Sequence, residues 1–325
     1  MVHKPKWLAS LIFVVAGIAT LMASVQAPAT NAYADKFAMY AALADQPHET
    51  IRIGGGTIEV VFADGAPGLD RPRVLNWIRN SAQAVSTYFG RYPVAKVGIL
   101  IIGEDGTRIN GGTTFGFAGS AIRIHVGRGA DDAAFAEDWI MTHEMTHLAL
   151  PVVPEESAWM LEGSATYVEP IARVQAGQLP ASEIWRQVIQ GMPKGLPQAG
   201  DQGLDHTPTW GRIYWGGALF CLLADVSIRE RTHNRFGLRD AFRAINRASG
   251  GNGAQWSMAQ LASVGDAATG TTVLHDLYNQ MKDTSTNVDL DSLFAKLGVS
   301  QQGSETIFDN AAPLAAVRKA IAAKS

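Results

Sequence analysis

The residues whose chemistry is easiest to infer are His143, Glu144 and His147, which form the pattern His-Glu-x-x-His. On a helix, positions four residues apart lie on one face, so both imidazoles can bind a single ion. Glu144 is rotated by about 100° from His143, which keeps it out of the ligand set but near water at the ion. This arrangement is typical of a zinc site in which the glutamate is the general base. We therefore expect one zinc ion per chain, bound by His143 and His147, with Glu144 as the base.

The residues before this motif predict the helix that carries it. Asp131 and Asp132 suit a helix N-terminus, and the apolar residues up to Met141 indicate a mostly buried helix. Pro151 is expected to end it. Two histidines among apolar neighbours would be poorly solvated, and a bound metal removes that cost. The alternative is a pair of core histidines satisfied by hydrogen bonds.

A catalytic zinc usually has three protein ligands, so a third residue is required. Glu162 is the best candidate, because a segment with helical periodicity follows Pro154 and would return alongside the first helix. The carboxylates of Glu155, Glu156 and Glu169 are alternatives that periodicity alone does not exclude.

The order of these motifs resembles the gluzincin metallopeptidases. In that family the His-Glu-x-x-His helix is followed by Trp-x-x-Glu-Gly-x-Ala-x-Tyr, and residues 159–167 of this chain carry the same string. The chain is similar to the glycyl aminopeptidases and to aminopeptidase N relatives. The resemblance implies that Glu162 is the third zinc ligand. It also implies a thermolysin-like α+β catalytic domain with peptidase activity.

Two further stretches are similar to the same family. Residues 212–220 resemble its Tyr-x-x-Gly-Ala-Leu helix, and residues 88–93 resemble its Tyr-Phe-Gly-x-Tyr-Pro entry to a strand. The first match places Tyr214 where aminopeptidase N relatives have a tyrosine that stabilises the oxyanion, although a core tyrosine is the alternative. The spacing from His147 to Glu162 is shorter than in these relatives, and their Gly-Ala-Met-Glu-Asn segment is missing. Substrate specificity is therefore not implied.

The segment before the histidines suggests how a substrate could bind. Residues 122–126 alternate as a strand, and a Gly- and Thr-rich stretch at 111–120 precedes them. The position of the strand matches the edge strand that lines gluzincin clefts, and such an edge can bind an extended peptide. The alternative is an ordinary strand after a flexible loop. Zinc-bound histidines usually donate their second N–H to a carboxylate or carbonyl, and Asp138, Thr166 and Glu169 are candidate partners.

The rest of the chain predicts a small α/β head and a helical body. Strands are expected at residues 51–62 and 96–103, around a helix at 71–89. We expect a mixed β-sheet with an edge strand in an N-terminal subdomain over residues 35–128. A helical zinc-binding catalytic subdomain is expected over residues 129–325.

The first 34 residues have the pattern of a secretory signal. Lys4 and Lys6 precede an apolar stretch at 7–22, and an Ala-x-Ala site ends at Ala34, so we expect cleavage after Ala34. This predicts a periplasmic or secreted protein with no stable membrane association after cleavage. An uncleaved anchor is the alternative, since the apolar stretch is short for a membrane span.

Composition and charge narrow the possible partners. The 325 residues carry 27 basic and 30 acidic side chains, a formal net charge of −3, with no basic stripe, so nucleic acid is not expected as a partner. Cys221 is the only cysteine and is expected in the core. A Gly- and Pro-rich loop at 191–211 is expected to border the active site.

These features predict an exported zinc metallopeptidase that acts on a peptide or protein substrate. Two alternatives use the same residues. One is a zinc hydrolase of a non-peptide amide, and the other is a non-catalytic peptide-binding or assembly module on a peptidase scaffold.

Overall fold

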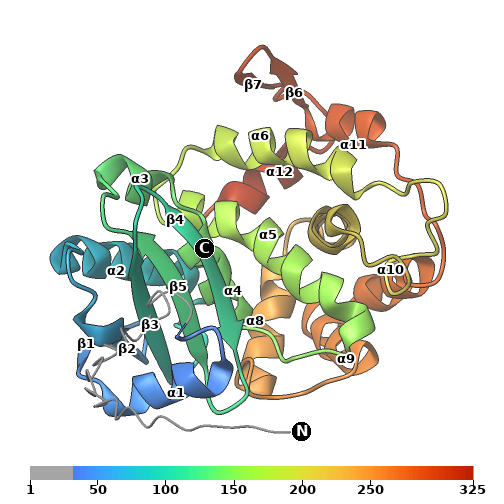
Figure 1. Ribbon diagram of the computed structural model, residues 1–325. Helices are drawn as coiled ribbons and strands as arrows, with labels where there is room; N and C mark the ends of the chain where they lie inside the picture. The colour runs from blue at the N-terminus through green and yellow to red at the C-terminus, as the bar shows by residue number, and fades with distance from the viewer. Residues whose placement is uncertain (1–31, 325) are drawn as a thin grey trace, which may run out of the picture.

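The computed structural model of the chain describes residues 32–324. Residues 1–31, which hold most of the expected signal, lie outside the described residues. A five-stranded sheet forms one side of the molecule and a body of helices forms the other (Figure 1). The sheet contains β1 (His48–Ile53), β2 (Gly56–Phe62), β3 (Lys96–Glu104), β4 (Ile109–Phe115) and β5 (Ala121–Gly127). This mixed architecture confirms the α+β prediction.

The helical body follows the sheet in the sequence and contains most of the helices. The helices are α1 (Lys36–Asp45), α2 (Arg71–Phe89), α3 (Asp132–Glu137), α4 (Ile140–His147), α5 (Ala158–Gln175), α6 (Ala181–Gly191), α7 (Gly217–Thr232), α8 (Leu238–Ser249), α9 (Met258–Thr269), α10 (Val273–Met281), α11 (Leu290–Leu297) and α12 (Ala315–Ala322). Helix α5 lies at the centre and packs against α2, α4 and α7. Side chains on α5 can therefore contact both the helices next to the sheet and the helical body.

Strand β3 is buried on both faces, and its successive side chains point alternately to one face and the other. On β3, Ile99 and Ile101 face the main core with α2, whereas Leu100 and Ile102 face a smaller cluster with α1. Fixed apolar contacts on both faces set the register of β3. Helices α1 and α2 thus cover opposite faces of the sheet.

The edge strand nearest the helical body is not the strand predicted at residues 122–126. The strand order is β1-β2-β3-β5-β4, so β5, which contains residues 122–126, lies between β3 and β4. Strand β4 is the edge, and it pairs antiparallel with β5. The prediction that residues 122–126 form the edge strand was wrong. The Gly- and Thr-rich stretch before them has few apolar residues, so it was not predicted as a strand. Its β-branched Thr113 and Thr114 nevertheless suit a half-buried strand.

The predicted helix before the histidines is two helices. Helix α3 ends at Glu137, and α4 begins at Ile140. The carboxylate of Asp138 accepts hydrogen bonds from the backbone N–H groups of Ile140 and Met141, which starts a new helix at that point. Helix α4 ends at His147, before Pro151 is reached.

Four further features complete the described part of the chain. The region after residue 290 is not all helical, since β6 (Val299–Gln302) and β7 (Glu305–Phe308) form a hairpin. Cys221 is fully buried in α7, as predicted. Among residues 32–324, no helix has both the length and the apolar character needed to cross a membrane. Arg123 donates hydrogen bonds to the carbonyls of Tyr33 and Ala34, contacts that cleavage after Ala34 would remove.

Candidate metal centre and active site

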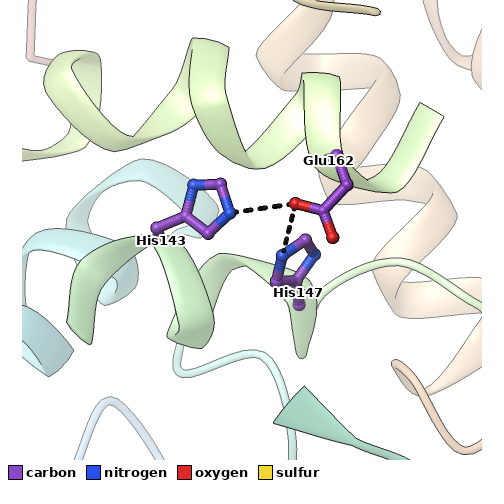
Figure 2. Close-up of side chains that lie close together, drawn as sticks. All are labelled: His143, His147 and Glu162. Atoms are coloured by element: carbon purple, nitrogen blue, oxygen red, sulfur yellow. Dashed lines mark hydrogen bonds and ion pairs between the residues drawn. The ribbon is translucent and has the colours of Figure 1, made fainter. Parts of the chain in front are cut away.

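Helices α4 and α5 bring the two histidines and Glu162 together. The start of α4 lies near the end of α5, where Arg173 donates to the Ala136 carbonyl just before α4. The end of α4 lies near the start of α5, where Glu162 meets His143 and His147. The helices are therefore antiparallel, as predicted from the short connection between them. Figure 2 shows the three side chains pointing toward one another.

The ligand atoms of these residues form a compact set. The Nε2 atoms of His143 and His147 lie 3.2 Å and 3.5 Å from Oε2 of Glu162. One ligand atom from each residue lies within 4.8 Å of the other two. Ligands about 2.0–2.1 Å from a tetrahedral zinc lie about 3.3–3.4 Å apart, so the two distances from the imidazoles to Glu162 suit this ion. Two imidazoles and one carboxylate are also a donor set that zinc accepts.

The charge states of His143 and Glu162 are those of metal ligands. Burial lowers the pKa of His143, which favours the neutral imidazole that metal binding requires. For His147, burial also lowers the pKa, but contact with Glu162 outweighs it and the net shift is upward. Burial opposes ionisation of Glu162, yet the two imidazoles dominate and its pKa falls below its usual range. The set therefore holds an anionic carboxylate.

Glu144 lies beside this set, under the edge strand. Thr114 of β4 lies with its hydroxyl 2.7 Å from Oε2 of Glu144 and 2.8 Å from the Glu144 carbonyl, so it can donate to either. A Cβ on Gly112 would lie 2.5 Å from Cγ of Glu144, so only glycine fits there. Gly112 leaves room for the carboxylate and Thr114 orients it. Both were missed as site residues because their strand was interpreted as a loop.

Tyr214 lies in a π-helix, Gly211–Gly216, that continues into α7. Such segments are rare and are often found at functional sites. The Tyr214 ring stacks against that of His143, with centroids 6.2 Å apart and an interplanar angle of 17°. Burial, together with the charge of Glu162, raises the pKa of Tyr214 to about 12. The hydroxyl therefore keeps its proton at neutral pH and can donate a hydrogen bond.

Two glycines explain how Tyr214 comes close to Glu162. A Cβ on Gly163 would lie 2.2 Å from the carbonyl carbon of Gly217, and a Cβ on Gly217 would lie 2.0 Å from the Trp159 carbonyl oxygen. Helices α5 and α7 thus touch backbone to backbone at this point. The glycine that follows Glu162 in the sequence motif is required for this contact.

The alternative third ligands lie elsewhere. Glu169 is 3% exposed and forms an ion pair with Arg173, at 3.0 Å. Burial raises the pKa of Glu169 to about 7, although Arg173 opposes the shift. Glu155 and Glu156 are exposed residues of a short 3-10 helix before α5. None of them belongs to the set of converging ligand atoms found among residues 32–324.

The expected partners of the histidines are engaged differently. Asp138 caps α4 and accepts a hydrogen bond from the Trp77 indole, so burial, which raises the pKa of this carboxyl, is partly offset. Within the described chain, Nδ1 of His143 is buried and has no hydrogen-bond partner. The usual outer-shell hydrogen bond is therefore missing at His143.

Two pockets meet at Tyr214. One, of about 330 Å³, is lined by β4 and contains Glu144, His147 and Glu162. The other, of about 460 Å³, lies on the His143 side and is rich in tryptophan. The loop predicted at 191–211 contributes Lys194 and Trp210 to the second pocket, so it does border the site.

Comparisons with known proteins place the fold. No family model matches the sequence, and no curated protein matches it. Among solved structures, the chain is similar to the aminopeptidase N family protein from Idiomarina loihiensis, with 14% sequence identity and a TM-score of 0.54, covering 79% of this chain and 50% of that chain. An M1 zinc metallopeptidase from Deinococcus radiodurans also matches, with 15% identity and a TM-score of 0.47, covering 75% of this chain and 53% of that chain.

The chain thus spans about half the length of the structures that it matches. At this level of identity the likeness shows the fold. It confirms, at the level of fold, the resemblance inferred from the two sequence motifs. The protein has the fold of an aminopeptidase N-like catalytic domain.

Proposed function

We propose that this protein is a zinc-dependent metallopeptidase. His143, His147 and Glu162 would bind one zinc ion, and Glu144 would act as the general base. The observation that carries the proposal is the convergence of three ligand atoms within 4.8 Å of one another, in a pocket that also contains the carboxylate of Glu144. A site that only stored zinc would not need that carboxylate.

The chemistry divides among the side chains described above. When bound, zinc supplies a Lewis acid that polarises the substrate carbonyl and acidifies water. Glu144, oriented by Thr114, accepts a proton from the attacking water and returns it to the leaving amine. Tyr214 donates a hydrogen bond to the oxyanion that develops on the carbonyl.

The edge strand supports a peptide as the substrate. The outer side of β4 has no partner strand among the described residues, and β4 lines the same pocket as Glu144. An extended peptide can pair with such an edge through its backbone, with little dependence on its side chains. The peptide bond to be cleaved would then lie between Glu144 and Tyr214, which line the same pocket.

The test is digestion of a mixed peptide library by the zinc-loaded protein, read by mass spectrometry. The Glu144→Gln variant is the control, and it should keep its zinc while losing about 10²–10⁴-fold in rate. Cuts that depend on Glu144 would support the peptidase. Equal cutting by both proteins, or none by a zinc-loaded protein, would contradict it. Tyr214→Phe should lower kcat by about 10²-fold with zinc retained.

The proposal includes export, which the signal-like residues 1–34 support. Mass determination of the protein recovered from the periplasm or medium tests it. A mature chain that starts at Asp35 agrees with the expected cleavage. A chain found only with its N-terminus intact in the cytoplasm contradicts export.

A further inference from the structure

The pocket on the His143 side has a wall made of aromatic rings in series. The ring of Trp139 meets that of His143 edge-on at 5.3 Å, and the ring of Tyr214 stacks on His143 at 6.2 Å. Trp210 then stacks on Tyr214 at 5.8 Å. Trp139 and Trp210 remain 49% and 61% exposed. Contiguous exposed apolar surface of this kind marks ligand-binding grooves and interaction sites.

The charge in this pocket comes mainly from Lys194. Its ammonium lies 5.6 Å from the centroid of Trp215 and 6.0 Å from that of Trp210. In residues 32–324 no carboxylate lies within ion-pair distance of it. Glu169 also lines the pocket, but it is paired with Arg173. The pocket is therefore aromatic with one uncompensated positive charge.

We propose that this pocket binds an uncharged aromatic side chain of the substrate, beside the cleaved bond, and that Lys194 excludes cationic side chains. The inference rests on the proposed function, because contact with His143 and Tyr214 places the pocket next to the reacting carbonyl. Aromatic rings alone would also attract a cation. Lys194 already occupies the faces of two of these rings and repels a second positive charge.

The size and lining of the pocket agree with this ligand. A volume of about 460 Å³ is within the range of small-ligand sites and is ample for one aromatic side chain. Gln187 and Gln190 of α6 add amide groups to the lining, which suit a tyrosine hydroxyl or an indole N–H. Gly191 has no space for a Cβ, which would lie 2.0 Å from the Trp215 ring. This glycine fixes the ring of Trp215 against the end of α6.

The first test compares cleavage of matched peptides. They would differ only in carrying phenylalanine or arginine on one side of the cleaved bond, and both sides would be tested. We expect kcat/KM to favour phenylalanine by at least about tenfold on one side. Lys194→Glu should shift this ratio toward arginine by about tenfold or more, whereas Lys319→Glu, at an exposed position of α12, should leave it unchanged. No preference on either side, or an unchanged ratio in Lys194→Glu, would overturn the inference.

The second test measures binding without turnover. Saturation-transfer NMR of the Glu144→Gln protein would use N-acetyl-L-phenylalaninamide and N-acetyl-L-argininamide as probes. The inference requires that the phenylalanine probe binds more strongly and that Trp210→Ala, checked for folding by circular dichroism, loses most of the signal. If this pattern appears without any peptide cleavage, the pocket stands and the peptidase proposal fails. If the protein cleaves peptides but neither probe shows this binding pattern, the pocket inference fails and the peptidase proposal stands.

Discussion

Two acids on one helix have opposite environments. Glu162 and Glu169 lie seven residues apart on α5, two turns along the same face. Glu162 meets two imidazoles, which overcome burial and keep its pKa low. Glu169 meets Arg173, yet burial dominates and raises its pKa to about 7. Glu162 meets partners on α4, whereas Glu169 meets a partner on its own helix, and these partners determine which acid can serve as a ligand.

The largest effect on the free energy of unfolding is expected from removing one member of the buried ion pair between Glu169 and Arg173. Glu169→Ala leaves the guanidinium of Arg173 buried without a carboxylate, and a guanidinium cannot lose its proton. We expect a loss of about 3–5 kcal/mol in the free energy of unfolding, measured with denaturant at pH 8, where Glu169 is ionised in the native protein. Arg173→Met should cost less at this pH, because Glu169 can become neutral once Arg173 is removed. Equal losses would show that Glu169 stays ionised in that variant.

Zinc affinity separates the two acids directly. Glu162→Gln removes the charged ligand and should weaken zinc binding by about 10²–10³-fold, measured by competition with a chelator. Glu169→Gln is the matched control and should stay within about tenfold of the native protein. A reversal of the two results would transfer the ligand role to Glu169.

The pH dependence of stability isolates Glu169. Its pKa is raised in the folded state, so the folded protein holds a proton between about pH 4.5 and 7 that the unfolded chain has lost. This group therefore makes stability fall as pH rises through that window, by up to about 3 kcal/mol. The difference in unfolding free energy between the native protein and Glu169→Gln should change with pH accordingly. A constant difference would mean that the pKa is normal.

The smallest effect on the free energy of unfolding is expected from changing Gly163, which packs against Gly217 beside Glu162. Gly163→Ala forces α5 away from Gly217 and should cost about 1–3 kcal/mol in unfolding free energy. It should also lower kcat, since Tyr214 moves relative to Glu162. Gly253→Ala, at a position where a Cβ has no neighbour within 4 Å, is the control and should be silent. Native activity in Gly163→Ala would show that the close contact is dispensable.

Much of the fold could be predicted from periodicity. The strands at 51–62 and 96–103 and the helix at 71–89 match β1, β2, β3 and α2, because their apolar residues repeat with the period of each element. The break at Asp138 was missed, since one carboxylate that caps a helix leaves no trace in a continuous apolar run. Strand β4 was missed because the pairing of an edge strand depends on its neighbour and not on its own hydrophobicity.

The site could be predicted in part. The spacing of the histidines defines one face of a helix, but the choice between Glu162 and Glu169 needed the family motif. The i, i+4 spacing of Glu169 and Arg173 indicates their ion pair. Local sequence could not reveal that Thr114 contacts Glu144 or that Arg173 also donates to the Ala136 carbonyl. These contacts join residues whose proximity depends on how α4, α5 and the sheet pack together.

The burial of Cys221 offers a probe for every stability comparison above. The side chain is fully buried in α7, and burial raises the pKa of its thiol. Thiol reagents attack the thiolate, so the folded protein should be inert toward them. Because the chain has one cysteine, each labelled molecule reports one opening of the core. Labelling rates under native conditions would therefore measure how often the centre of the helical body becomes exposed to solvent.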